Sequence, residues 1–340
     1  MDFAENLKKY SNVRTISIAF PASIFDYVPT PQLEAYLVGQ VARAAVVFNV
    51  TEVVIFNEVQ SDESQSRLER LVKLFEYAEC PQYLRKKVFG IEPDLKYAGL
   101  IHPLEAQHHL RTSQIDCPYR EGITTEHTHY EFKGKSQEFT IVNIGLSKPV
   151  HLPGKHPLNT RVTVQVDPAD LRKMQAMLSS TMQAPHAALV SPVDPIEKLN
   201  LYWGYYVRSA ASLTEAISGN VFIPSKKNFY DIIIGTSERG DCLDDIEFKK
   251  SEKKDKPNQE QGERPAKKGK LEFNHILVVF GGVKGLEHSA ACDKQLEGCN
   301  DFRSIFDYYL NTCPNQGSTT IRTEEAILIT LSALRPKLNL

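Results

Sequence analysis

Four short apolar runs limit the fold of this chain more than any other feature. They are TISIAFPA at residues 15–22, EVVIF at 52–56, YDIII at 230–234 and HILVVF at 275–280. The first two predict strands on either side of residues 32–48, where apolar side chains recur at helical spacing. The last two are bounded by glycine, which is typical of buried strands in a parallel sheet. The sequence therefore predicts an α/β fold.

The pattern between these runs changes twice. Residues 64–77 predict an amphipathic helix, and 82–89 extend the helical region. Short alternating segments then lie between Gly, Pro and Asn residues, which is typical of a small β-barrel. The helical pattern returns at residues 199–217, and a last helix is predicted at 324–334, before Pro336. We therefore divide the chain into an α/β part at 1–103, a β-rich insert at 104–192 and a second α/β part at 193–340.

The charge is unevenly distributed. Residues 249–270 carry nine basic and four acidic side chains, so the remainder of the chain, with 31 basic and 38 acidic residues, has a net charge of -7. A mildly acidic body does not favour nucleic-acid binding by bulk charge, so any RNA surface must be a local patch. Segment 249–270 has almost nothing apolar to bury and is expected to be a disordered charged loop.

Several classes of protein are not indicated. The longest apolar runs are far too short to cross a bilayer and the first residues contain no apolar signal region, so we expect neither membrane insertion nor secretion. The six cysteines contain no C-x-x-C pair, and we predict no metal site and no disulfide framework.

Three glycine-containing loops in the C-terminal third predict a ligand site. They are residues 235–240 after YDIII, 281–287 after HILVVF, and 311–322 before the last helix. In open α/β sheets, ligands bind beyond the carboxyl ends of the strands, where glycine permits close approach of the backbone. The glycine spacing fits neither a dinucleotide fingerprint nor a phosphate-binding loop. A plain turn remains the alternative for each loop.

The same segments carry a resemblance to a known family. LYWGYYVR (201–208), IIGTSERG (233–240), VVFGGVKGLE (278–287) and NTCPNQGSTTIRTEEAILITLSAL (311–334) resemble the signature segments of a eukaryotic and archaeal family of SPOUT-class RNA methyltransferases. TISIAFPAS and REGIT are also similar to that family. The resemblance covers nearly the whole chain except the charged segment 249–270.

The resemblance implies a fold and a cofactor. It implies a parallel sheet with a deep C-terminal trefoil knot, an OB-fold-like insert, a homodimer and S-adenosyl-L-methionine as cofactor. The implied cofactor-binding residues occupy the three loops: Gly235, Thr236, Ser237, Phe280, Gly281, Gly282, Gly285, Leu286, Glu287, Asn311, Thr312, Cys313, Gln316, Gly317, Ser318, Thr320 and Ile321. A branched side chain at Gly281 or Gly317 is expected to abolish cofactor binding.

Three arginines are candidates for the chemistry. Methyl transfer requires alignment of donor and acceptor and stabilisation of changing charge, and methylation at N3 of uridine also requires loss of a proton. Arg322, Arg239 and Arg208 are therefore the candidate catalytic residues. The alternatives are a surface arginine beside a helix start for Arg322 and a helix-surface ion pair for Arg208.

Other conspicuous residues favour structural roles. Thr323 is predicted to cap the last helix, with Glu324 and Glu325 favourable in its first turn. Cys313 is unaccompanied by a second cysteine or a base, and the histidines at 108–109 and 127–129 favour polar surface or RNA contact over a metal site. The aromatic residues of LYWGYY favour core packing, with stacking on bases as the alternative.

The expected function is methylation of a base in ribosomal RNA, with N3 of uridine as the candidate atom. Lys148, Lys155 and Arg161 in the insert are the candidate RNA-binding residues. The expected location is the nucleus, in particular the nucleolus. The alternative is a ribosome-assembly or ribonucleoprotein-binding factor that retains the fold with little or no catalysis.

Overall fold

The protein is described by a computed structural model that covers residues 13–132, 135–176, 184–219, 229–246, 248, 273–299 and 301–338. The predicted charged loop 249–270 lies outside the described residues. The chain divides into two compact units. Unit 1 comprises Met1–Val72 and Tyr205–Leu340, and unit 2 comprises Lys73–Gly204.

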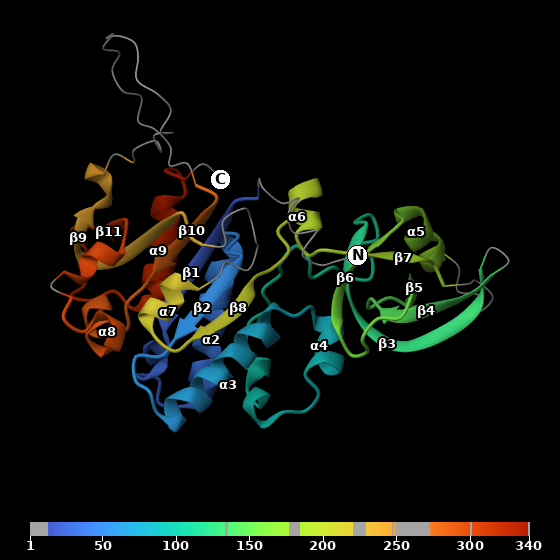
Figure 1. Ribbon diagram of the computed structural model, residues 1–340, viewed down its shortest axis with the longest axis horizontal. Coiled ribbons are helices and arrows are strands. Elements are labelled where there is room, and N and C mark those ends of the chain that lie inside the picture. The colour runs from blue at the N-terminus through green and yellow to red at the C-terminus, as the bar shows by residue number, and fades with distance from the viewer. Residues whose placement is uncertain are drawn as a thin grey trace, which may run out of the picture. The chain divides into compact units, whose positions relative to one another are not determined.

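Unit 1 contains a six-stranded parallel sheet in the order β11-β9-β10-β1-β2-β8 (Figure 1). The α/β prediction is thereby confirmed. The strands are β1 (Thr15–Pro21), β2 (Glu52–Phe56), β8 (Tyr206–Ala210), β9 (Ile232–Cys242), β10 (His275–Val279) and β11 (Tyr308–Asn311). All residues of β1, β2 and β10 are buried, as expected for strands covered on both faces.

Helices lie on both sides of this sheet (Figure 1). Leu213 and Ala216 of α7 (Leu213–Ser218) and Leu286 and Ala290 of α8 (Leu286–Cys292) pack with alternate residues of the central strands. The helix α2 (Pro31–Val47) begins where Thr30 Oγ1 accepts a hydrogen bond from the Leu33 amide, and it packs against α9 (Thr323–Leu334). The predicted helices at 32–48, 64–77 and 324–334 correspond to α2, α3 (Asp62–Glu79) and α9.

The predicted helix at residues 199–217 is wrong for residues 200–212, and only its last part corresponds to a helix, α7 (Leu213–Ser218). A short helix, α6 (Asp194–Leu199), ends at Asn200, whose φ is 53°, and Gly204 has a φ of 90°. These left-handed conformations interrupt a right-handed helix, so residues 200–205 form no helix. The chain continues into β8, which pairs with β2, before α7 begins.

The first predicted glycine loop lies within a strand rather than after it. β9 continues through residues 235–240 to Cys242 because β11 pairs with both of its halves. Tyr309 lies opposite Gly235, whereas the next residue, Leu310, lies opposite Asp241. Residues 236–240 therefore form an irregularity in the ladder, a device that redirects side chains.

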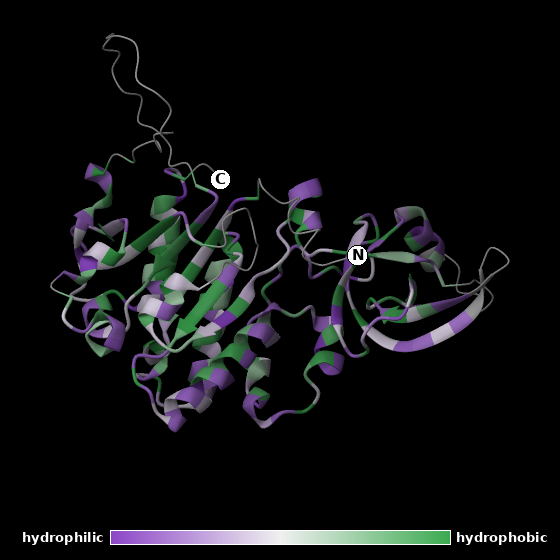
Figure 2. Cartoon of the chain, viewed as in Figure 1, coloured by the Kyte–Doolittle hydropathy of each residue, from purple (hydrophilic) through white to green (hydrophobic). Residues whose placement is uncertain are grey.

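Unit 2 is built on a five-stranded antiparallel sheet in the order β5-β4-β3-β6-β7. The strands are β3 (Tyr119–Phe132), β4 (Lys135–Asn143), β5 (Val150–Pro153), β6 (Arg161–Val166) and β7 (Ala187–Val190), and the unit also contains α4 (Gln82–Val88) and α5 (Pro168–Ala176). Residues along β3 are mostly polar, in contrast to the apolar strands of unit 1 (Figure 2). One side of the sheet packs on Leu171 and Met174 of α5.

Unit 2 is larger than the predicted insert at 104–192. All five strands lie inside the predicted range, but Cys80 and Leu84, before it, pack against Ile123 of β3. Trp203, after it, packs against Leu110 and Tyr119. These apolar contacts place the flanking segments in the same compact unit.

A buried ionic cluster joins the same segments. Both Glu79 carboxylate oxygens accept hydrogen bonds from the Arg161 guanidinium, at 2.6 and 3.0 Å, and Arg161 Nε donates to Glu121 at 2.7 Å. Trp203 Nε1 donates to Glu121 at 2.7 Å, and His108 Nε2 lies 2.8 Å from Glu79. Burial alone would raise the pKa of Glu79, but Arg161 and His108 together outweigh it and hold the pKa well below its usual range.

Candidate functional site

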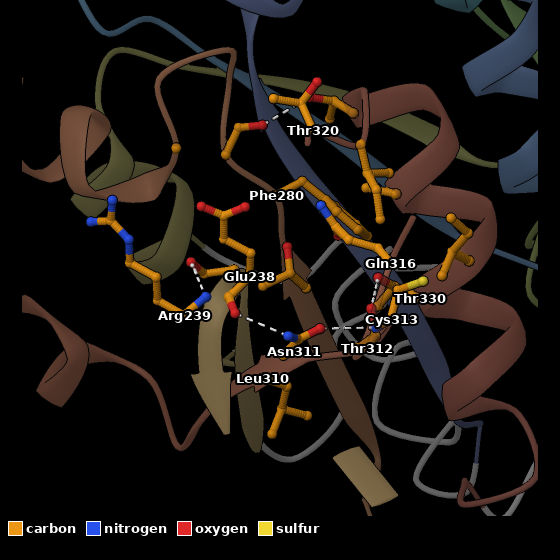
Figure 3. Close-up of a pocket in the computed structure, with 18 of the residues that line it drawn as sticks. Glu238, Arg239, Phe280, Leu310, Asn311, Thr312, Cys313, Gln316, Thr320 and Thr330 are labelled. Atoms are coloured by element: carbon orange, nitrogen blue, oxygen red, sulfur yellow. Dashed lines mark hydrogen bonds between the residues drawn. The ribbon is translucent and has the colours of Figure 1, made fainter. Parts of the chain in front are cut away.

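A pocket of about 300 Å³ lies at the carboxyl ends of the strands in unit 1 (Figure 3). We call it the strand-end pocket. It is lined by residues 236–239 of the β9 irregularity, by residues 280–285 and Glu287 after β10, and by residues 310–313, 316, 320 and 321 from the end of β11 and the loop that follows it. Thr323, Ala326, Ile329 and Thr330 of the first two turns of α9 complete the lining. All three segments that the sequence predicted to form one ligand site therefore meet here.

Hydrogen bonds between the segments hold the pocket together. Thr236 Oγ1 donates to the carbonyl of Val279 at 3.0 Å, and Asn311 Nδ2 donates to the carbonyl of Glu238 at 2.9 Å. The other end of the Asn311 amide accepts from the Cys313 N–H at 3.0 Å, as Figure 3 shows. A parallel sheet brings these strand ends to one edge, and the side chains then fix the loops to one another.

Glycine is needed at two positions of the loop after β10. A Cβ at Gly281 would lie 2.6 Å from the Leu286 amide nitrogen and 2.7 Å from the Gly285 carbonyl carbon, both backbone atoms. Gly285 has a φ of 79°, which favours glycine. Thr323 Oγ1 donates to the Gly281 carbonyl at 2.9 Å and so ties this loop to the start of α9.

The lining combines an apolar wall with polar groups. Phe280, Leu310 and Ile321 are apolar, and α9 adds Ala326 and Ile329. Glu238 and Glu287 contribute carboxylates, and Glu287 Oε1 accepts a hydrogen bond from the Tyr309 hydroxyl at 3.2 Å. Such a site suits a ligand with a flat apolar ring and a positive group, and S-adenosyl-L-methionine has both. No group of residues able to hold a metal ion occurs in the part of the chain that the structure describes.

Comparisons with known proteins agree with a site for this cofactor. The family model described as "Putative RNA methyltransferase" matches residues 15–334 of this chain. The chain belongs to this family. A Drosophila melanogaster protein named "28S rRNA (uridine-N(3))-methyltransferase" is 36% identical over 350 residues, which cover 97% of this chain and 64% of the relative. A Homo sapiens protein of the same name is 38% identical over 336 residues, which cover 95% of this chain and 78% of the relative.

The chain thus spans less than two thirds of the length of the fruit-fly relative. Among solved structures, the SpoU methyltransferase AviRb from Streptomyces viridochromogenes, in complex with AdoMet, aligns with 96% of this chain and 60% of its own. Its sequence identity is 10% and its TM-score is 0.28, a similarity too low to define the fold of this chain.

Most residues predicted to bind the cofactor of this family line the strand-end pocket, and four do not. Leu286 is fully buried beneath the loop, and Gly235 packs against Phe306 and Tyr309. Gly317 and Ser318 lie outside the lining. A Cβ at Gly317 would meet nothing within 4 Å, so its predicted steric role has no support. The residues that line the pocket are Thr236, Ser237, Phe280, Gly281, Gly282, Gly285, Glu287, Asn311, Thr312, Cys313, Gln316, Thr320 and Ile321.

Sequence reasoning missed the face that α9 presents to the pocket. Ala326, Ile329 and Thr330 recur at positions i, i+3 and i+4 of the helix, so helical spacing could have marked them as one face. Thr330 Oγ1 lies 2.7 Å from Thr312 Oγ1. The other missed lining residues are Glu238, Val283, Lys284, Leu310 and Thr323.

The three candidate catalytic arginines do not lie together in the structure. Arg239 lines the strand-end pocket, and in Figure 3 it lies on the opposite side of the labelled group from Cys313 and Thr330. The Arg322 guanidinium does not line the pocket but lies 5.3 Å from the centre of the Tyr27 ring. The backbone N–H of Arg322 donates to the Glu325 carboxylate at 3.0 Å, so Arg322, rather than the predicted Thr323, occupies the cap position of α9.

Arg208 belongs to a buried network away from the pocket. Its Nε donates to Glu52 at 3.0 Å, and Tyr230 donates to the same carboxylate at 2.6 Å. Burial alone would lower the pKa of Arg208, but Tyr230 and Glu52 raise it. Arg208 lies on β8 rather than on a helix, and its bonds indicate a structural role.

The candidate RNA-binding residues also differ from one another. Arg161 is bound to Glu79 and Glu121, so its charge is compensated inside unit 2 and is not offered to RNA. Lys155 is exposed, and Lys148 is partly buried. Tyr202, Trp203 and Tyr205 are buried, which agrees with the favoured core role, whereas Tyr206 is exposed.

Proposed function

We propose that this chain is an S-adenosyl-L-methionine-dependent methyltransferase that modifies N3 of a uridine in ribosomal RNA. The observation that carries the proposal is the convergence of three segments on one strand-end pocket with an apolar wall and two carboxylates. Membership of the RNA methyltransferase family and the names of the fruit-fly and human relatives supply the substrate class. When bound, S-adenosyl-L-methionine supplies an electrophilic methyl group.

The residues of the pocket would bind and orient that donor. Phe280, Leu310 and Ile329 offer apolar contact to a purine ring, and Glu287 offers a negative charge to a cationic group. The loop backbone around Gly281 can approach a ligand closely because no side chain intervenes. Arg239 is the remaining candidate for electrostatic stabilisation, since it alone of the three predicted arginines lines the pocket.

We further propose the finer features of the fold. A trefoil knot is supported by the course of residues 312–323. They run from β11 back to the loop after β10, where Thr323 Oγ1 donates to the Gly281 carbonyl. An OB-like barrel in unit 2 is supported by the strand order β5-β4-β3-β6-β7 and by a parallel bridge between His151 of β5 and His186, which directly precedes β7.

We also propose a homodimer. Leu33 and Tyr36 on α2 and Leu328 on α9 are exposed apolar side chains on helices that pack against each other. Leu33→Asp combined with Leu328→Asp should give a monomer by light scattering. The structure describes no helix long and apolar enough to cross a membrane. The proposed location is the nucleolus, because ribosomal RNA is the proposed substrate, and imaging of a tagged full-length protein tests it.

The function is tested with the purified chain. Calorimetry should detect binding of S-adenosyl-L-methionine, and incubation with an unmodified transcript of large-subunit ribosomal RNA should yield N3-methyluridine by mass spectrometry of the nucleosides. Binding of donor and RNA without methyl transfer would support the assembly factor instead. Absence of donor binding by a folded protein would reject the proposal.

A further inference from the structure

A second pocket lies beside the strand-end pocket in unit 1. Its volume is about 610 Å³, within the range of sites that hold small organic ligands. It is lined by residues 22, 23, 26 and 27 after β1, by residues 57–59 after β2, and by residues 61, 63, 64 and 67 around the start of α3. Val283, Lys284 and His288 complete the lining. We call it the Glu58 pocket. Val283 and Lys284 line both pockets, so a ligand in one would lie next to a ligand in the other.

The wall between the two pockets is thin. Gly282 lines the strand-end pocket, and a Cβ on it would lie 2.6 Å from Ser23 Oγ and 3.7 Å from Glu58 Oε1. Ser23 and Glu58 themselves line the Glu58 pocket. The backbone of Gly282 therefore lies between these two polar side chains and the pocket that we assign to the methyl donor.

The polar groups of the Glu58 pocket match the edge of a uracil ring. Uracil presents an N3–H donor between two carbonyl acceptors. Ser23 Oγ is buried and has no hydrogen-bond partner among the described residues, and Asn57 is also buried, so a hydroxyl and an amide are suited to the carbonyls. The Glu58 carboxylate can accept the N3–H. Cytosine has a lone pair at N3, which a carboxylate repels.

The rim of the pocket suits the remainder of a nucleotide. Tyr27 is 40% exposed and offers an aromatic face on which a base can stack. Lys284 makes no salt bridge within the described part of the chain, so its charge is available to a phosphate. Arg67 is less available, because it pairs with Asp26 and Glu34.

We propose that the Glu58 pocket receives the target uridine and that Glu58 accepts its N3 proton. This inference rests on the proposed function. The carboxylate takes the proton from N3, the N3 electron pair forms the bond to the methyl carbon, and the electron pair of the sulfur–carbon bond passes to sulfur. The products are N3-methyluridine, neutral S-adenosylhomocysteine and a protonated Glu58, which returns its proton to water. The positive sulfonium and the negative carboxylate are neutralised together.

Binding is tested without catalysis. The full chain, saturated with S-adenosylhomocysteine, is irradiated with 4-thiouridine 5′-monophosphate, and the adducts are mapped by mass spectrometry. Adducts are expected on peptides containing Tyr27, Glu58 or Lys284, and uridine monophosphate should compete better than cytidine monophosphate. Val59, which is 59% exposed, lines only the Glu58 pocket, so Val59→Trp should reduce these adducts at least fivefold. The matched control Val47→Trp, on α2 outside both pockets, should retain them.

Both tryptophan variants should keep the affinity of the unaltered chain for S-adenosylhomocysteine, which shows that they fold. Adducts that are equally strong in Val59→Trp, or that map only to other surfaces, overturn the assignment of the pocket. Because this readout needs no methyl transfer, it decides the question even if the proposed function fails.

The role of Glu58 is tested by replacing its carboxylate with the side-chain amide of glutamine. Glu58→Gln retains an acceptor for Ser289, whose hydroxyl donates to Glu58 at 2.5 Å, but it cannot take a proton. The expected result is a fall in kcat of at least tenfold, with little change in KM, and a smaller deficit at high pH, where N3 ionises by itself. Glu69→Gln, on the exposed face of α3, is the control. An unchanged pH profile of kcat overturns the role, as does an unaltered protein that transfers no methyl group.

Discussion

At the scale of single residues, substitutions at Gly281 and at Gly317 are expected to have opposite effects on cofactor binding. Gly281→Val should abolish binding of S-adenosyl-L-methionine, because its side chain would collide with the backbone of Gly285 and Leu286. Gly317→Val should bind normally, since the space around Gly317 is open. Calorimetry on both variants, with circular dichroism to verify folding, measures this difference. Equal affinities would show that the loop after β10 adjusts more easily than its contacts indicate.

His109 makes unit 2 sensitive to acid. Burial, and next the proximity of His108, lowers the pKa of His109 to about 4, and its ring donates to the Glu79 carbonyl at 2.6 Å. An unfolded histidine has a pKa of about 6.5. Between these values the unfolded chain binds more protons than the folded chain, so stability is full above about pH 6.5 and falls as the pH is lowered towards 4.

The expected slope from His109 is at most about 1.4 kcal/mol per pH unit. Urea unfolding followed by the fluorescence of Trp203, the single tryptophan of the chain, measures it in unit 2. His109→Gln should flatten the dependence between pH 6.5 and 4. If the variant and the unaltered chain lose stability in parallel, other groups control the acid response.

At the scale of secondary structure elements, prediction succeeded where local pattern and tertiary environment agree. Buried strands such as β1, β2 and β10 are recognised by their apolar runs, and α2 and α9 by the helical spacing of their apolar residues. The run at 201–206 failed because its aromatic spacing is compatible with a helix, whereas the backbone at Asn200 and Gly204 is not. The continuation of β9 depends on β11, about seventy residues away, and no local pattern reveals such pairing.

The candidate site could likewise be predicted only in part. The loops could be predicted because glycine after an apolar strand marks a close backbone approach at the edge of a parallel sheet. The contribution of α9 and the separation of Arg239 from Arg322 and Arg208 could not, since they depend on the direction in which each side chain points. Arg208 and Arg161 were candidates for functional roles, but each binds a buried carboxylate that lies far away in the sequence.

Residues 249–270 connect β9 to β10, two neighbouring strands of the sheet, and remain a prediction from composition. Deleting them should leave the melting temperature and the affinity for S-adenosyl-L-methionine nearly unchanged, because the segment has nothing apolar to bury. RNA affinity or nuclear import are the properties that could change. A large fall in the melting temperature would show that the segment packs on the protein.

At the scale of the whole molecule, the two units should divide the work. Lys148→Ala with Lys155→Ala in unit 2 should weaken RNA binding and reduce its salt dependence, because fewer counterions are released. Donor binding in unit 1 should not change. Arg161 is left in place, since its removal would strand two buried carboxylates. Titrations with RNA at several salt concentrations and with S-adenosyl-L-methionine decide this, and an unchanged salt slope would exclude both lysines from the RNA surface.

In the middle of the unit 1 sheet, two strands that are far apart in the sequence pair with each other. Thr15 of β1 lies opposite His275 of β10, although 260 positions separate them. Unit 2 is instead one continuous stretch, complete once Gly204 has been synthesised. During translation, β1 and β2 can pair with each other, but β2 lacks β8 and β1 lacks β10 until long after both strands have been synthesised. Long-range parallel pairing is slow and prone to aggregation. We expect unit 2 to fold during translation and unit 1 to need chaperones until the C-terminal strands emerge.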